Sequence, residues 1–260
     1  MSAPFDHVVV MVPALEPMVR EFAAAGFTVL PGGRHDGLPT ENALVCFADG
    51  GYLELLAALE PGTRDELRAL RATDGWESHL RGVSAVARRF LPRLAGADGV
   101  ADWVLRSGSL SRPSARLRQL GLVASGPVPM SRERTDGEVI SWDMLLPESA
   151  LQPMWIADQT PRERRVPGGA AATTHANGAR AVRSVRVRAL NVPSAALELG
   201  DALGVTPSLR TDGTSSLEFG DWRVEVGAGE PEGAFAVVLA GCGPLPESIG
   251  ALGILSAETP

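Results

Sequence analysis

Apolar and polar positions in the first sixty residues follow a strand, helix and three-strand pattern. The run DHVVVMVP predicts a buried strand that ends at Pro13, because proline has no N–H to donate to a sheet. Apolar residues then recur at helical spacing until Gly26, which suits the end of a helix. FTVL, ALVCFA and YLELLAA predict three further strands. The expected order is βαβββ.

The same order of elements returns farther along the chain. A shift of 95 residues places Asp102 at the position of His7 and leads to a second helix, a polar hairpin and the strand QPMWIAD. Residues 61–99 have helical periodicity and predict a connecting insertion. A fainter third copy starts with VRSVRVRALNVP, where Val187 takes the position of His7. The Arg-, Pro- and Gly-rich segment before it predicts a linker.

Two polar residues stand out in the first copy. His7 begins an apolar strand, and Glu54 lies inside another, YLELLAA. A buried carboxylate is unfavourable unless it finds a cation or hydrogen-bond donors. A metal ion shared with His7 is one candidate partner for Glu54. A His–Glu hydrogen bond or a bridge to an arginine is the alternative.

Several of these segments together resemble the glyoxalase-like domain of the vicinal oxygen chelate superfamily, which includes glyoxalases, bleomycin-resistance proteins and dioxygenases. They are DHVVVMVP, the helix ending at Gly26-Phe27, the glycine-rich loop Gly32 to Asn42, and the strand Gly51 to Glu54. The resemblance is close over about residues 5–60 and weaker beyond.

The resemblance implies an α+β fold of repeated βαβββ modules that pair into an eight-stranded cup. The modules would be about residues 5–60 and 100–158 of a domain spanning 1–160, with the insertion 61–99 between them. Residues 176–260 would form a third, degenerate βαβββ-like module. An unpaired copy exposes a strand edge, which predicts a homodimer.

The resemblance also implies a divalent metal, Zn, Mn, Fe or Ni, held by His7, Glu54 and Asp102. The function would be lyase, isomerase or dioxygenase chemistry on a small oxygenated molecule, with Glu54 also a candidate catalytic base. The second copy departs from the family, because Asp102 replaces the expected His or Gln and no glutamate stands in the fourth strand. This departure favours the alternative, a metal-free small-molecule binding protein of the bleomycin-resistance type.

Three more residues are candidates for contact with a substrate. The loop Gly32–Asn42 predicts the edge of a pocket, with His35 as a proton shuttle and ligand contact and Asn42 as a second contact. The alternative is an ordinary surface turn. His175 lies in THANGAR, where Asn177-Gly178 favours a turn, and a linker folded back over the cup would bring His175 to the pocket.

Composition and charge narrow the functional classes. A net charge of −7 argues against a nucleic-acid or anionic-membrane surface. All 24 basic residues are arginines, which excludes a Schiff-base lysine and a Walker-type phosphate loop. The linker contains Arg162, Arg164 and Arg165, which we expect to form a run of solvated side chains. The two unpaired cysteines and the absence of a long apolar segment predict a cytoplasmic protein.

Overall fold

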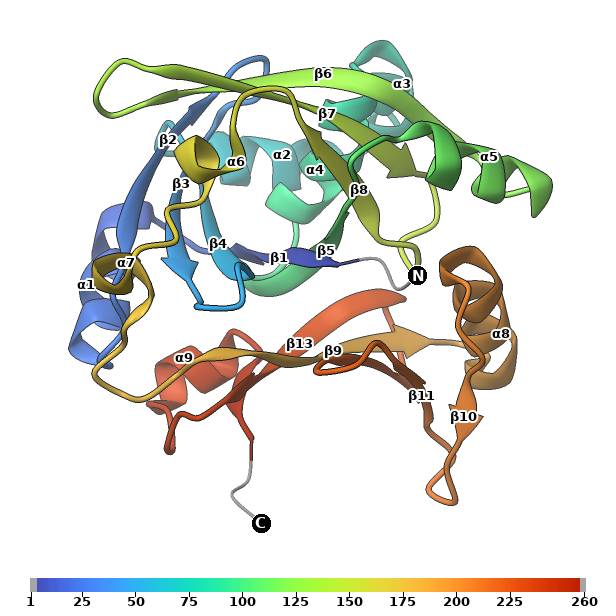
Figure 1. The fold of residues 1–260 in the computed structure, drawn as a ribbon. Coiled ribbons are helices and arrows are strands. Elements are labelled where there is room, and N and C mark those ends of the chain that lie inside the picture. Colours follow the sequence, from blue (N-terminus) through green and yellow to red (C-terminus); the bar gives the residue numbers. More distant parts are fainter. Residues whose placement is uncertain (1–3, 258–260) are drawn as a thin grey trace.

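The computed structural model describes residues 4–257, so the outer ends of the two predicted domains, residues 1–3 and 258–260, lie outside the described residues. Eight strands close into a barrel in the order β1-β4-β3-β2-β6-β7-β8-β5 (Figure 1). The first half contains β1 (Phe5–Met11), α1 (Leu15–Ala24), β2 (Leu30–His35), β3 (Thr40–Cys46) and β4 (Tyr52–Ala58). The second half contains β5 (Gly99–Arg106), α5 (Ser111–Gln119), β6 (Ala124–Arg134), β7 (Val139–Pro147) and β8 (Met154–Asp158). The predicted pair of βαβββ modules is confirmed.

Strand β1 joins the two halves and is buried on both faces. It pairs in parallel with β4, which places His7 beside Tyr52, and antiparallel with β5, which places His7 opposite Val104. Side chains alternate between the faces of a strand. Val9 and Met11 therefore belong to the core inside the barrel, and residues 8 and 10 belong to the core outside it.

The insertion is helical, and it does more than connect the modules. It contains α2 (Thr63–Arg71), α3 (Trp76–Gly82) and α4 (Ala85–Leu94). The apolar face of α4, including Phe90 and Leu94, packs in the same core as the inward residues Val9 and Met11 of β1. The insertion therefore fills part of the barrel interior.

The glycine-rich segment was expected to be a loop, and that expectation is wrong. β2 reaches His35 and β3 begins at Thr40, so only a short turn separates two paired strands. The glycines allow strands to approach closely: a Cβ atom on Gly32 would lie 1.9 Å from Asn42 Oδ1. Gly33 has φ +151°, and a Cβ there would lie 2.0 Å from the carbonyl oxygen of Glu133. Asn42 is consequently a buried strand residue.

The C-terminal region forms a six-stranded sheet, ordered β10-β11-β12-β9-β13-β14, beside the barrel (Figure 1). Its elements are β9 (Ala181–Ala189), α8 (Val192–Leu203), β10 (Ser208–Leu209), β11 (Ser215–Glu218), β12 (Arg223–Ala228), β13 (Gly233–Ala240), α9 (Glu247–Ala251) and β14 (Ile254–Ser256). β12 runs parallel to β9 as β4 does to β1, which completes a third βαβββ unit. Val187 is fully buried in this sheet. After this unit, β13 pairs antiparallel with β9, and β14 pairs parallel with β13.

The barrel and the C-terminal sheet share one apolar core. Val8 and Trp103 of the barrel belong to the same cluster as Val185 and Val224 of the sheet. Trp222 packs against Phe5 with ring centroids 5.2 Å apart.

No helix within residues 4–257 has the length and apolar character needed to cross a membrane.

Candidate functional site

A small cavity inside the barrel has a polar side and an apolar side. Its volume is ≈ 30 Å³, about the share of one water molecule in the liquid. The polar lining residues are His7, His35, Tyr52, Glu54, Arg132 and Arg165. The apolar lining residues are Leu38, Leu56, Phe90, Met130, Trp142, Met144 and Ile156. Four of the six polar lining residues come from the first module, and four of the seven apolar ones come from the second.

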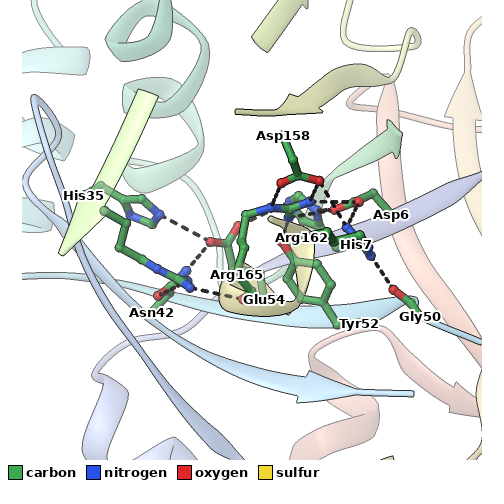
Figure 2. Close-up of polar contacts among 11 residues, drawn as sticks. Asp6, His7, His35, Asn42, Gly50, Tyr52, Glu54, Asp158, Arg162 and Arg165 are labelled. Atoms are coloured by element: carbon green, nitrogen blue, oxygen red, sulfur yellow. Dashed lines mark hydrogen bonds and ion pairs between the residues drawn. The ribbon is translucent and has the colours of Figure 1, made fainter. Parts of the chain in front are cut away.

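Glu54 lies at the centre of the polar side, between two histidines. Its Oε2 is 3.5 Å from His7 Nε2, and its Oε1 is 3.6 Å from His35 Nε2 (Figure 2). Asn42 Nδ2 also donates a hydrogen bond of 2.5 Å to Oε1. Burial raises the pKa of Glu54, but the hydrogen bond and charge of His7 outweigh it, with smaller effects of His35 and Asn42, and lower the pKa to about 2. Glu54 is therefore a carboxylate at neutral pH.

His7 lies between two carboxylates. Its Nδ1 is hydrogen-bonded to Asp6 Oδ1 at 2.7 Å, and its ring stacks on Tyr52 with centroids 4.5 Å apart. Burial lowers the pKa of His7, but the carboxylates of Asp6 and Glu54 reverse this effect and raise the pKa above 6.5. The arrangement stabilises the charged imidazolium form.

His35 has the opposite electrostatic surroundings. Its Nδ1 is hydrogen-bonded to Thr40 Oγ1 at 3.1 Å, and its ring meets the edge of Trp142. Burial lowers the pKa of His35 below 6.5, and the nearby cations Arg132 and His7 lower it further, against the raising effect of Glu54. The neutral imidazole is therefore the favoured form of His35.

Asn42 connects Glu54 to Arg132, a residue that the sequence analysis missed. Arg132 Nη1 donates to Asn42 Oδ1 at 3.0 Å, and Nη2 donates to the carbonyl oxygen of Arg165 at 3.3 Å. The side-chain amide of Asn42 thus accepts from a cation and donates to an anion. The only hint in the sequence was the general need of Glu54 for a cationic or donor partner. Nothing in the spacing identified β6 as the strand that carries the arginine.

The linker contributes a second arginine to the site. Arg165, at the end of α6 (Arg162–Arg165), is 2% exposed, so the predicted solvated run is wrong for this residue. Its guanidinium binds Asp6 at 3.0 Å, Asp158 at 2.5 Å and the Tyr52 hydroxyl at 2.8 Å (Figure 2). Arg162 reaches the other oxygen of Asp6 at 2.5 Å. The linker therefore fixes Asp6, which in turn orients His7.

The other two predicted site residues lie elsewhere. Asp102 accepts hydrogen bonds of 2.9 and 3.0 Å from Arg89 and is 2.6 Å from Arg93, both on α4. It is 1% exposed and is not among the residues that line the cavity. His175 accepts from the backbone N–H of Thr28 at 2.9 Å, and its Nε2 is 3.0 Å from the carbonyl oxygen of Cys46. His175, in the segment after α7 (Ala170–Thr173), thus fastens the linker to the barrel.

These residues fit a metal ion incompletely. Within residues 4–257, no three His, Cys, Asp or Glu side chains are grouped in a way that could hold an ion. His7 and His35 face different oxygens of Glu54, and Asp102 is bound to arginines. Asp6 and Asp158 are also paired with Arg162 and Arg165, and Glu54 lies beside the charged form of His7. A divalent cation would add uncompensated positive charge to a buried site.

Comparisons with known proteins agree with this architecture. A family model described as a glyoxalase-like domain matches residues 5–203. A hypothetical protein from Staphylococcus aureus has 15% sequence identity and a TM-score of 0.69, and the match covers 92% of this chain and 91% of that one. No curated protein matches the sequence.

Two enzymes of known type are also similar in structure. An extradiol ring-cleaving dioxygenase from B. fuscum has 11% identity and a TM-score of 0.55, over 92% of this chain and 58% of that one. The Mn(II)-bound glyoxalase from Novosphingobium aromaticivorans has 12% identity and a TM-score of 0.50, over 92% of this chain and 65% of that one. At these identities the likeness concerns the fold.

Proposed function

The chain belongs to the glyoxalase-like domain family, and we propose that it is an enzyme that moves protons on a small oxygenated molecule in the cup, with His35 as base and His7 as acid. The observation that carries this proposal is the placement of two buried histidines at different oxygens of Glu54. Neighbouring histidines in opposite electrostatic surroundings are suited to acid and base roles.

The two histidines would divide the reaction between them. His35, held at Nδ1 by Thr40, offers Nε2 to accept a proton from a carbon next to a carbonyl group. The electron pair of that C–H bond forms a C=C bond while the carbonyl π pair moves to oxygen, where the N–H of charged His7 stabilises the negative charge. Return of the proton to another carbon gives an isomerase, and departure of a leaving group gives a lyase.

Glu54 has a supporting role in this scheme. A carboxylate with a pKa of about 2 is a weak base at neutral pH. Its negative charge instead keeps His7 protonated, and its bond with Asn42 fixes its orientation. The sequence-based assignment of Glu54 as a base is therefore replaced by that of an electrostatic partner.

The divalent-metal hypothesis uses His7 and Glu54 as ligands and needs further donors. Neither Asp102, which is bound by Arg89 and Arg93, nor His35, on the far oxygen of Glu54, supplies one in the described arrangement. The bond from Asp6 to His7 Nδ1 is of the kind that supports metal-binding histidines, but it equally stabilises an imidazolium. The proposed chemistry uses the protein's own acid and base.

A substrate larger than water requires the cavity to open. Two lining residues, Phe90 of α4 and Arg165 of α6, come from segments outside the two βαβββ modules. Side-chain contacts rather than sheet hydrogen bonds hold these segments to the barrel, among them Arg89 with Asp102 and Arg165 with Asp6. Opening at α4 or α6 would have to break such contacts.

The proposal is tested by solvent deuterium exchange. Protein dialysed against EDTA is incubated in D₂O with a panel of small aldehydes, ketones and keto acids, and loss of C–H signals is followed by NMR. We expect exchange in at least one compound and a decrease of at least about a hundredfold in His35→Gln. His79→Gln, on the partly exposed helix α3, is the control and retains the rate.

Three results would contradict the proposal. Exchange that appears only after a divalent metal is added would favour the metal enzyme. Equal rates in wild type and His35→Gln would remove His35 as the base. Tight binding of a compound without exchange or turnover across the panel would favour the alternative of a small-molecule binding protein.

A further inference from the structure

Arg132 differs from the other buried arginines of the described chain. Arg64, Arg89 and Arg165 each form an ion pair with an aspartate, Asp98, Asp102 and Asp6 respectively. Arg132 is 3% exposed and has no carboxylate within ion-pair distance among residues 4–257. Its guanidinium is the one buried cation here whose charge is met by neutral acceptors alone.

The hydrogen bonds of Arg132 are also incomplete. Nη1 and Nη2 donate to Asn42 Oδ1 and to the carbonyl oxygen of Arg165, and Nε has no partner within the described chain. A buried donor without an acceptor is unfavourable, and more so when it is charged. Glu54 is not an acceptor for Arg132 Nε, because its contacts are with Asn42 and the two histidines.

Arg132 is also one of the residues that line the cavity. The apolar lining of the cavity includes the ring of Trp142, on the strand paired with that of Arg132, and the ring of Phe90. A molecule that satisfies both walls has an anionic group at one end and an apolar body at the other. A guanidinium forms two parallel, charge-assisted hydrogen bonds with a carboxylate. Nε and one terminal nitrogen of the guanidinium are the two donors of such a pair.

We propose that Arg132 is the binding group for a carboxylate of the substrate, so that the substrate is a small organic acid with an apolar or aromatic body. This inference rests on the proposed function and specifies its substrate class. The carboxylate supplies the charge that the protein does not provide to Arg132. The apolar body then lies along Trp142 and Phe90, next to the histidines.

Matched acids and amides test the inference. Benzoate, phenylacetate and crotonate, each with its neutral amide, are titrated by calorimetry into EDTA-treated protein. We expect at least one acid to bind at least tenfold more tightly than its amide. Arg132→Met should abolish this preference, and Arg134→Met, which removes a partly exposed arginine of the same strand, should retain it.

Stability gives a second readout that a structural arginine would not produce. Arg132→Met removes hydrogen bonds to two neutral acceptors and should lower the melting temperature less than Arg89→Met, which takes a cation away from the buried carboxylate of Asp102. The inference is overturned if acids and amides bind alike to the wild type, or if Arg132→Met keeps the preference. A loss of stability in Arg132→Met as large as that in Arg89→Met would also overturn it, because Arg132 would then act as a structural arginine.

The His35→Gln variant separates this inference from the proposed function. If the anion site is correct, His35→Gln keeps the preference for acids over amides even though proton exchange is lost. Acid preference in a wild type that catalyses no exchange would support Arg132 as an anion site and contradict the proposed acid–base reaction. Proton exchange without acid preference would support the acid–base reaction and contradict Arg132 as an anion site.

Discussion

The carboxylate of Asp102 is held by the guanidinium of Arg89 through two hydrogen bonds of 2.9 and 3.0 Å. This pair joins β5 to α4, and the same arginine also donates to the carbonyl oxygens of Pro147 and Gln152. A residue that the sequence placed at the metal site thus fastens the inserted helix to the barrel. The helix in turn supplies Phe90 to the cavity.

Removal of the negative charge at Asp102 should strongly destabilise the fold. Asp102→Asn leaves Arg89 and Arg93 as buried cations without an anion, and breaking a buried pair in this way costs about 3–5 kcal/mol. Urea unfolding measures the change in the free energy of unfolding. Asp136→Asn, in an exposed pair with Arg134, should change this free energy little. Equal effects of the two substitutions would show that the Asp102 pair does not anchor α4.

Asn42 should matter for folding as well as for the site. In Asn42→Ala, both Glu54 and Arg132 lose a buried hydrogen-bond partner, at a cost of about 1–3 kcal/mol. Thermal unfolding should therefore shift to lower temperature. Glu41→Ala, at the neighbouring half-buried position of β3, is the control with little effect. An unchanged melting temperature in Asn42→Ala would contradict this role in folding and would agree with the earlier expectation of a loop residue.

The first module could be predicted well from the sequence because its strands and helix are local patterns. The run DHVVVMVP and the charged position in YLELLAA identified β1, β4 and the two residues His7 and Glu54. These patterns indicate which side chains share a face of the sheet, once β1 and β4 are known to pair in parallel. The repeat at a distance of 95 residues likewise identified the second module, because α1 and α5 both end before a glycine.

The remaining site residues could not be predicted because they depend on contacts between distant segments. Arg132 comes from β6 and Arg165 from the linker, and both reach the first module only after the barrel has closed. Asp102 has the strand position expected of a ligand, but the insertion carries two arginines that bind it. His175 is fixed by backbone groups of Thr28 and Cys46, which no local pattern indicates.

Glu54 should make the protein sensitive to acid. Its pKa in the folded protein is about 2, below the ordinary value of 4.5, so the folded state binds fewer protons than the unfolded state between these values. Its contribution, about 3 kcal/mol, is present above pH 4.5 and is lost as the pH falls toward 2. Melting temperatures of wild type and Glu54→Gln between pH 2 and 7 measure it. The variant should show the flatter decline at low pH, and parallel curves would contradict the lowered pKa.

The charge states of His7 and His35 provide the most direct test of the account. The chain contains four histidines, so an NMR titration of histidine-labelled protein in EDTA resolves each ring. The variants His7→Gln and His35→Gln assign the signals of these two rings. Asp6, Glu54, Tyr52, Arg165 and Arg132 are the titratable or charged groups around the pair. We predict that the pKa of His7 lies above 6.5 and that of His35 below it. A higher pKa for His35 than for His7, or stoichiometric binding of added Mn²⁺ or Zn²⁺ by both rings, would contradict the proposed acid–base pair.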